Sequence, residues 1–490
     1  RPRGCDSTLL DLRPIFFIVG VLLTTLAAAM CAPLIVDAIK ENPDWKVFAA
    51  SAGLTLFVGV TMTLTCRSSW TRFSIRQAFI LTTASWLVLT MFAALPFAFA
   101  GLGLSYTDAF FEAMSGITTT GSTVMTGLDN APHGILLWRS LLQWLGGIGI
   151  IVMAVAILPV LQIGGMQLFR MESSDRSEKV MPRVTQIASG IGFIYLGLTA
   201  ICALALWTSG FSGFDAIAHA MTTIATGGFS TSDGSIGGFG NEYAEVIITI
   251  FMILGGLPFV LYLQAVRGDP MAILRDSQVR WFISFVALCI GITVLWFYST
   301  HEVNLLSALR YVSFNVVSII TGTGYTSADY GAWGGFAIVV FFFIMFVGGC
   351  AGSTTCGIKV FRFQVLYATA ETQIKRLIQP HGVFIAHFNQ RPITEEVAGS
   401  VMSFFYLFVI SFIVLTLLLS MIGLDFITAV SGAATAICNV GPALGEIIGP
   451  MGNFQTLPDA AKWVLSAGML LGRLELFTVL ILFAPSFWKG

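Results

Sequence analysis

Charged residues are scarce in this sequence. Only 10% of the 490 residues are Asp, Glu, Lys or Arg, against about 25% in an ordinary soluble protein, and 56% are hydrophobic. The 25 basic and 26 acidic residues nearly cancel, so there is no basic surface for nucleic acid. A soluble enzyme and a nucleic-acid-binding protein are both excluded. Because the apolar residues extend over the whole length, the sequence predicts an all-α polytopic membrane protein.

Motifs of metal sites and hydrolases are also missing. The eight cysteines include no CxxC pair, so we expect free thiols and no metal site built from them. The sequence contains no GxSxG, no HExxH and no helix with paired carboxylates, which are the patterns of membrane-embedded hydrolases. We therefore expect neither an enzyme nor an organic cofactor.

Long apolar runs are what the sequence has instead. Each is close to or above the roughly 20 residues that a helix needs to cross about 30 Å of hydrocarbon. Ten candidate spans result: 15–36, 47–65, 77–100, 135–163, 186–208, 243–265, 281–299, 335–365, 397–422 and 461–487.

The basic residues predict which side each loop faces. With the N-terminus inside, nineteen of the 25 Lys and Arg fall in cytoplasmic segments, five face outward, and Arg473 lies within the last span. Basic residues collect on the cytoplasmic side of a membrane protein. Both termini are therefore predicted to be cytoplasmic.

Four stretches between spans are too apolar for loops and too short to cross the membrane. Each begins with a half-length apolar helix and then breaks into Gly, Thr or Asn, which is typical of re-entrant segments. They read DAFFEAMSGITTTGST from residue 108, DAIAHAMTTIATGGFST from 215, NLLSALRYVSFNVVSIITGTGYTS from 304, and DFITAVSGAATAICNVGPALG from 425. Asp108, Asp215 and Asp425 are predicted to cap three of these helices.

Aligning the four stretches gives an internal repeat with glycines at 121, 228, 324 and 441. The fold class that follows is four span, pore-loop, span repeats around one pore, plus an N-terminal two-span hairpin. The predicted units are the hairpin 1–70 and pore repeats at 71–170, 171–268, 269–380 and 381–490.

Four matched re-entrant segments predict a cation path. A helix that ends at mid-membrane points its carbonyl oxygens, and the negative end of its dipole, toward a cation. Extended backbone after it offers rings of carbonyl oxygens that replace a hydration shell, and glycine permits the left-handed dihedrals that this backbone needs. No acidic side chain lies in the extended filter strands that follow the four short helices. A divalent-cation filter built on a ring of carboxylates is therefore disfavoured, and a dehydrated monovalent cation remains. The candidate filter residues are Thr118, Thr119, Thr120, Gly121, Ala225, Thr226, Gly227, Gly228, Thr321, Gly322, Thr323, Gly324, Cys438, Asn439, Val440 and Gly441.

Over its whole length the sequence resembles the Trk, Ktr and HKT superfamily of potassium transporters. The resemblance rests on TTTGST, ATGGFST, TGTGYTS and CNVGPALG in the four segments, on QWLGGIGIIVMAVAILP from residue 143, on GGCAGSTTCGIKVFR from 348, and on LLGRLELFTVL from 470. The two extra N-terminal spans match the TrkH branch. The fourth segment departs from the others because it has no Thr.

The resemblance implies potassium uptake across the bacterial inner membrane, with K⁺ as the transported ion at the filter residues. It also implies a homodimer in the membrane lipid and cytoplasmic TrkA-like regulatory subunits that bind nucleotides. No nucleotide-binding motif occurs in this chain. A proton- or sodium-coupled potassium symporter is the alternative, but carboxylates and histidines within the spans are few.

The resemblance places a gate in the third inner span and an arginine below the filter. Small and polar residues in mid-span also break a helix, which is tolerated beside water. Close helix packing of small residues is the alternative for this stretch, and a salt bridge to Glu475 or Glu446 is the alternative for the arginine. The candidate gate residues are Gly348, Gly349, Gly352, Ser353, Thr354, Thr355, Gly357 and Arg473.

Overall fold

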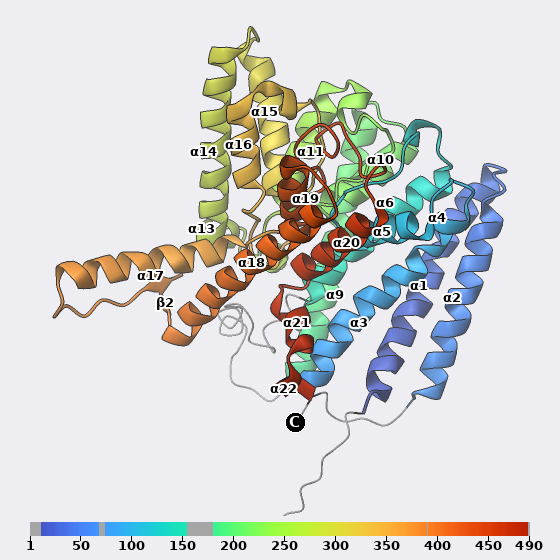
Figure 1. Ribbon diagram of the computed structural model, residues 1–490, viewed down its shortest axis with the longest axis horizontal. Coiled ribbons are helices and arrows are strands. Elements are labelled where there is room, and N and C mark those ends of the chain that lie inside the picture. The colour runs from blue at the N-terminus through green and yellow to red at the C-terminus, as the bar shows by residue number, and fades with distance from the viewer. Residues whose placement is uncertain (1–10, 68–73, 154–179, 390, 489–490) are drawn as a thin grey trace, which may run out of the picture.

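The computed structural model describes residues 11–67, 74–153, 180–389 and 391–488, and it is built almost entirely of helices (Figure 1). The two short strands β1 (His387–Phe388) and β2 (Arg391–Pro392) form one antiparallel hairpin. The all-α prediction is confirmed. The seven cysteines in the described ranges are free thiols.

Two long helices form the N-terminal hairpin, α1 (Arg13–Ile39) and α2 (Trp45–Thr65), which lies at the right of Figure 1. They pack closely through two glycines: a Cβ added to Gly20 would lie 2.8 Å from the carbonyl oxygen of Gly59, and one added to Gly59 would lie 2.9 Å from that of Gly20. Small residues allow helix backbones to approach in this way within a membrane. The predicted hairpin is therefore held by backbone contact.

The remaining helices follow the predicted order of outer helix, short helix and inner helix. The outer helices are α3 (Ile75–Ala93) with α4 (Leu95–Phe99), α9 (Val180–Thr208), α14 (Ser277–Thr300) and α18 (Glu395–Met421). The short helices are α5 (Tyr106–Ile117), α10 (Gly213–Ile224), α15 (Leu305–Ile320) and α19 (Phe426–Cys438). The inner helices are α6 (His133–Val152), α11 (Glu242–Gly255) with α12 (Phe259–Val266), α16 (Gly335–Ile344) with α17 (Val360–Ile378), and α20 (Asp459–Arg473) with α21 (Phe477–Leu480).

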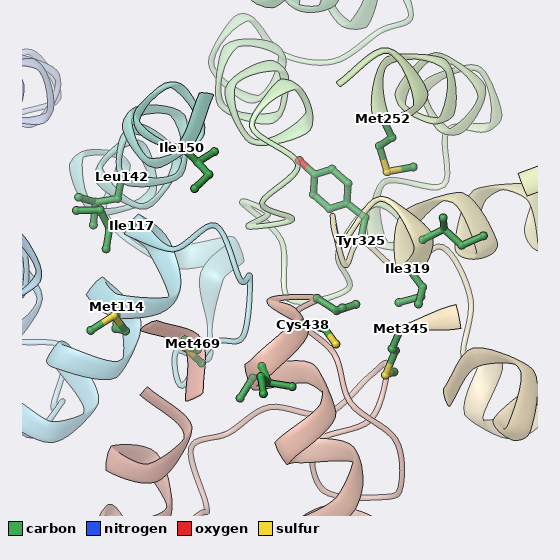
Figure 2. Packing of buried hydrophobic residues seen from close by; sticks show 14 of the residues in the cluster. Met114, Ile117, Leu142, Ile150, Met252, Ile319, Tyr325, Met345, Cys438 and Met469 are labelled. Carbon is green, nitrogen blue, oxygen red and sulfur yellow. The ribbon is translucent and has the colours of Figure 1, made fainter. Parts of the chain in front are cut away.

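Smaller elements complete the described part of the chain: α13 (Ala272–Arg275), α22 (Pro485–Trp488), and the 3-10 helices η1 (Leu128–Asn130), η3 (Gly237–Phe239), η4 (Tyr330–Trp333) and η5 (Ile481–Phe483). Most of the buried hydrophobic residues form one large cluster that reaches every unit, and Phe79 and Phe487 form a small separate cluster. Figure 2 shows Ile117, Met252, Ile319 and Cys438, one from each of the four units, around the same central region.

Each short helix begins at a polar N-cap, although two of the three aspartates differ from the prediction. Ser105 and Ser212 cap α5 and α10, and Asp108 and Asp215 lie three positions further on. Asp425 does cap α19, as expected. Hydrogen bonds from the side chain and the backbone N–H of Thr428 lower the pKa of Asp425. Serine competes well for this position because its hydroxyl reaches the same free backbone N–H groups.

Three inner spans are broken: we expected the break in 335–365, but we expected 243–265 and 461–487 to be continuous helices. The predicted span 243–265 bends by 92° between α11 and α12, and 461–487 bends by 109° between α20 and α21. The predicted span 335–365 is helical only to Ile344 and then irregular up to α17. Seven helices of the described ranges are long and apolar enough to cross a membrane, or nine if each bent pair counts as one span. The first inner span, 135–163, is helical to Val152, and its end lies outside the described residues.

Candidate functional site

The four central segments, defined as residues 118–121, 225–228, 321–324 and 438–441, meet in a closed ring. A Cβ added to Gly121 would lie under 3.0 Å from the carbonyl oxygen of Gly227 in the second segment. The same holds for Gly228 and the carbonyl oxygen of Thr323, for Gly324 and that of Val440, and for Gly441 and that of Thr120. Each aligned glycine thus lies against the carbonyl oxygen of the residue that precedes the aligned glycine of the next unit.

Each central segment also has two residues with left-handed backbone. All four aligned glycines have φ between 78° and 106°. The residue two positions earlier is left-handed as well: Thr119 at 53°, Thr226 at 49°, Gly322 at 68° and Asn439 at 51°. We expected positive φ only at the glycines. Asn adopts left-handed backbone more readily than most residues. Nothing in the sequence indicates left-handed backbone at Thr119 and Thr226.

Threonine hydroxyls tie the first and third segments internally. The Thr118 and Thr120 hydroxyls lie 2.7 Å apart, and those of Thr321 and Thr323 lie 2.8 Å apart. The second segment differs because Thr226 donates to the carbonyl of Ala225 at 2.8 Å. The fourth segment, which has no Thr, uses Asn439 instead.

The Asn439 amide donates to the Thr120 hydroxyl at 2.9 Å and to the carbonyl of Met469 at 2.8 Å. Its neighbours Cys438 and Val440 are fully or almost fully buried. The fourth segment therefore lacks a threonine hydroxyl but makes a hydrogen bond to the first segment through the side chain of Asn439.

A cavity of about 70 Å³ lies on the side where the chain leaves the central segments. All four aligned glycines line it, together with polar residues that include Ser230, Asp233 and Arg139. Four parts of the chain that lie far apart in the sequence therefore share one polar cavity.

The opposite side of the ring is covered by the irregular stretch between α16 and α17. Cys356 Sγ lies 3.7 Å from the Thr119 hydroxyl, and a Cβ added to Gly322 would lie 3.5 Å from the Cys356 nitrogen. Thr354 accepts from the Thr226 hydroxyl at 3.2 Å. The stretch 354–356 therefore contacts the left-handed residues of the first, second and third segments.

Backbone and hydroxyl hydrogen bonds dock this stretch against the break between α11 and α12. The amides of Cys350 and Thr354 donate to the carbonyls of Gly256 and Gly255 at 3.1 and 3.3 Å. The Thr354 hydroxyl bonds the carbonyl of Gly255 at 3.0 Å. Among the candidate gate residues, Ser353, Thr354 and Thr355 are buried.

The glycines of the stretch have several roles. Gly352 and Gly357 have φ of 75° and 71°. A Cβ added to Gly348 would collide with the carbonyl oxygen of Cys356, and one added to Gly349 would lie 2.6 Å from the Thr355 hydroxyl. Because residues 348–357 are not helical, the alternative of a helix-packing patch does not apply to them.

Arg473 is buried beside the same stretch. Its Nη1 lies 3.3 Å from the carbonyl oxygen of Thr354 and 2.6 Å from Cys356 Sγ, and its Nη2 lies 3.1 Å from the carbonyl oxygen of Gly146. Within the described ranges Arg473 makes no ion pair, so the salt-bridge alternative is not observed. Glu475 pairs with Arg362 instead, because left-handed backbone at Glu475 and Leu476 turns the chain at the end of α20.

Three buried residues at the site were missed by sequence reasoning. Arg139 pairs with Glu112 at 2.8 Å, and both side chains are at most 1% exposed. Gln143, one turn further along α6, contacts the second central segment. The signal was available, since Arg139 lies within the predicted span 135–163 and charges inside spans are usually functional.

A multi-pass helical protein that brings four matched segments of irregular backbone to one place is a membrane transport protein. The match to a family model makes this specific: residues 45–489 match TrkH, described as "Cation transport protein". This chain belongs to the TrkH family.

Relatives match over nearly the full length. The chain is 46% identical to the Trk system potassium uptake protein TrkI of Halomonas elongata, covering 99% of both chains. It is 39% identical to the Trk system potassium uptake protein TrkH of Escherichia coli K12, covering 97% of this chain and 99% of the relative. A crystal structure of the potassium transporter TrkH from Vibrio parahaemolyticus superposes with a TM-score of 0.91 at 37% identity, covering 98% and 100% of the two chains.

Proposed function

We propose that this protein takes up K⁺ through the ring formed by the four central segments. The closed ring of close approaches between each aligned glycine and the next unit's carbonyl oxygen is the observation that carries this proposal. A dehydrated cation needs several oxygen ligands at once, and a ring of backbone carbonyls supplies them without a fixed charge. The potassium uptake named for the relatives in Halomonas elongata and Escherichia coli agrees with this chemistry.

The ion path consists of the sixteen residues of the central segments, and the pore repeats are those predicted at 71–170, 171–268, 269–380 and 381–490. The left-handed residues support this assignment, because alternating backbone handedness turns successive carbonyls toward one side. The cavity lined by all four aligned glycines is where a hydrated ion first meets the ring.

The gate consists of residues 348–357 together with Arg473. Contacts of Cys356 and Thr354 with three of the four central segments support a barrier directly beneath the ring. Arg473 adds a positive charge that opposes a cation in the same passage. Opening requires that the hydrogen bonds of Thr354 and Cys350 to the α11–α12 break be released.

The protein works as a homodimer in the lipid of the bacterial inner membrane, with both termini cytoplasmic and with TrkA-like nucleotide-binding subunits beneath it. The distribution of Lys and Arg supports the orientation. The "Trk system" names of the relatives support an assembly of several components. In Figure 1, α17 projects away from the central helices, and Lys375 and Arg376 lie in its last turn. We assign this helix to the cytoplasmic side, where it connects the gate to regulatory subunits.

The experiment is reconstitution of the purified protein into liposomes loaded with K⁺. We expect uptake of a tracer such as ⁸⁶Rb⁺ in exchange for the internal K⁺, with no proton or sodium gradient imposed. Transport that starts only when a proton or sodium gradient is imposed would instead establish the coupled symporter. No flux of K⁺ under any gradient would overturn the proposal.

A further inference from the structure

Two side chains of α6 hold the second central segment from behind. Arg139 and Gln143 are four residues apart, so they project from the same face of the helix. Gln143 is fully buried and Arg139 is 1% exposed. Both make hydrogen bonds to backbone of residues 227–230. We call these two residues the α6 clamp.

Gln143 brackets the aligned glycine of the second segment. Its Nε2 donates to the carbonyl oxygen of Gly227 at 2.5 Å, and its Oε1 accepts from the Phe229 N–H at 3.0 Å. One amide therefore fixes the peptide groups on both sides of Gly228. The Gly227 carbonyl oxygen is also the atom against which Gly121 packs. Gln143 consequently fixes the contact between the first and second segments.

Arg139 joins the chain that follows the first segment to the chain that follows the second. Its Nη1 donates to the carbonyl oxygen of Ser230 at 2.7 Å, and its Nη2 donates to the Thr123 hydroxyl at 3.1 Å. Its guanidinium carbon lies 4.1 Å from the ring centroid of Phe229. The planar guanidinium suits such a fork, since lysine cannot make several fixed hydrogen bonds of this kind.

Glu112 neutralises the charge of Arg139 and is bonded to the chain that follows the first segment. Its carboxylate accepts from Arg139 Nε at 2.8 Å, from the Thr123 hydroxyl at 3.0 Å and from the Val124 N–H at 2.9 Å. Arg139 lines the cavity in front of the ring. An unpaired arginine there would repel an arriving cation, and the carboxylate removes that effect.

The junction between the fourth and first segments is held by neutral groups instead. Ser122 donates to the carbonyl of Gly441 at 2.8 Å, and the Asn439 amide donates to the Thr120 hydroxyl. Hydrogen bonds to charged groups are stronger than those between neutral groups. The ring is thus held more firmly at the first and second segments than at the fourth.

We propose that Arg139 and Gln143 are positioning residues that set the discrimination between K⁺ and Na⁺. The inference rests on the proposed passage of K⁺ through the ring. Discrimination depends on the spacing of the carbonyl oxygens and on their freedom to close around a smaller ion. A Gly227 carbonyl without its amide partner is free to turn, so the ring accepts Na⁺ more readily.

The test measures K⁺ and Na⁺ fluxes separately on the reconstituted full chain. Gln143→Leu and Gln143→Asn remove the bracket, and Arg139→Lys keeps the charge while losing the fork. We expect the K⁺ to Na⁺ flux ratio to fall by about tenfold in each, since one or two buried hydrogen bonds are lost. Gln364→Leu and Arg310→Gln are the matched controls, because they remove a buried glutamine and an ion-paired arginine whose contacts lie away from the central segments.

Gly228→Ala is measured in parallel, so that failure of the proposed role of the α6 clamp can be told from failure of the proposed ion path. If Gly228→Ala changes the flux ratio and the clamp variants do not, the clamp is rejected and the ring stands. If neither changes the ratio, the proposed ion path is rejected as well. If both Gln143 variants fail to insert while Gln364→Leu inserts normally, Gln143 serves folding and the positioning role is overturned.

Discussion

The guanidinium group of Arg473 donates to the backbone carbonyl of Thr354, with 3.3 Å between nitrogen and oxygen. The contact connects the end of the last inner helix to the irregular stretch of the third, across more than a hundred residues of sequence. Arg473 forms no ion pair with a carboxylate in the described part of the chain. The positive charge of Arg473 is therefore held beside the proposed path by backbone carbonyls and a cysteine sulfur, without a carboxylate.

Arg473→Gln is expected to raise K⁺ flux by about tenfold or more, because two charges about 4 Å apart repel by roughly 4 kcal/mol at an effective dielectric of 20. Flux per folded molecule in liposomes is the measurement. Arg473→Lys keeps the charge and is the control, which should conduct at close to the original rate. Equal flux in the Gln and Lys variants would contradict the barrier.

Each aligned glycine, changed to Ala, is expected to lower the K⁺ to Na⁺ flux ratio. A Cβ at 121, 228, 324 or 441 collides with a carbonyl oxygen of the next unit, and φ between 78° and 106° is unfavourable for Ala. Gly53→Ala is the matched control, because nothing lies within 4 Å of its added Cβ. Four Ala variants with the original flux ratio would remove the ring from the ion path.

Thr354→Val should raise K⁺ flux up to about fivefold without changing ion preference. The substitution keeps the volume but removes the hydroxyl whose single proton is shared between the carbonyls of Gly255 and Ile224, a contribution of roughly 1 kcal/mol. Single-turnover tracer uptake in liposomes measures it. Thr416→Val is the control, since that hydroxyl bonds only within α18. A changed flux ratio would mean that Thr354 belongs to the filter and not to the gate.

Loss of the Glu475 carboxylate from the buried Arg362–Glu475 pair is expected to destabilise the protein by about 3–5 kcal/mol, because removing one partner of a buried ion pair is costly. Glu475→Gln is the variant, and the midpoint of thermal unfolding in detergent is the measurement. The exposed pair of Lys375 and Glu371 provides the comparison, and Lys375→Gln should shift stability by no more than about 0.5 kcal/mol. Similar midpoints for both variants would show that Glu475 is accessible to water.

Asp37→Ala should loosen the N-terminal hairpin from α6. The Asp37 carboxylate accepts from the Gly134 N–H at 2.7 Å, close to the first residue of α6. A lost helix cap typically costs about 1 kcal/mol, so we expect a lower unfolding midpoint. Asp37→Asn keeps a hydrogen-bond acceptor, so its unfolding midpoint should lie close to that of the unchanged protein. A shifted K⁺ to Na⁺ ratio in Asp37→Ala would further indicate that the position of α6 governs the clamp.

The helical membrane architecture and the four-unit repeat could be predicted from the sequence because both follow from local patterns of residues. Apolar runs of spanning length have one stable solution in a bilayer. The aligned glycines at 121, 228, 324 and 441 likewise recur after the same half-length helix, so their equivalence needed no coordinates. The family, too, followed from motifs at these positions and was confirmed by the match over residues 45–489.

The breaks in the inner helices could not be predicted in the same way. The apolar character of 243–265 and 461–487 is that of ordinary spans, yet the chain bends in the breaks 256–258 and 474–476. Glu475 is pulled toward Arg362, which comes from another unit, and Gly255 receives Thr354 from another unit. Such partners are more than ninety residues away, so local propensity does not contain them.

The sequence by itself therefore determined the membrane-spanning class, the number of repeats and the glycines that each repeat contributes, because hydrophobicity and backbone freedom are properties of single segments. Only the tertiary structure decided which carbonyl oxygen each glycine meets, that Arg473 lies against Thr354, and that Arg139 and Gln143 hold the second segment. Those facts depend on how four separated segments close into one ring. Buried polar groups must find partners wherever the fold brings them, and that choice is made in three dimensions.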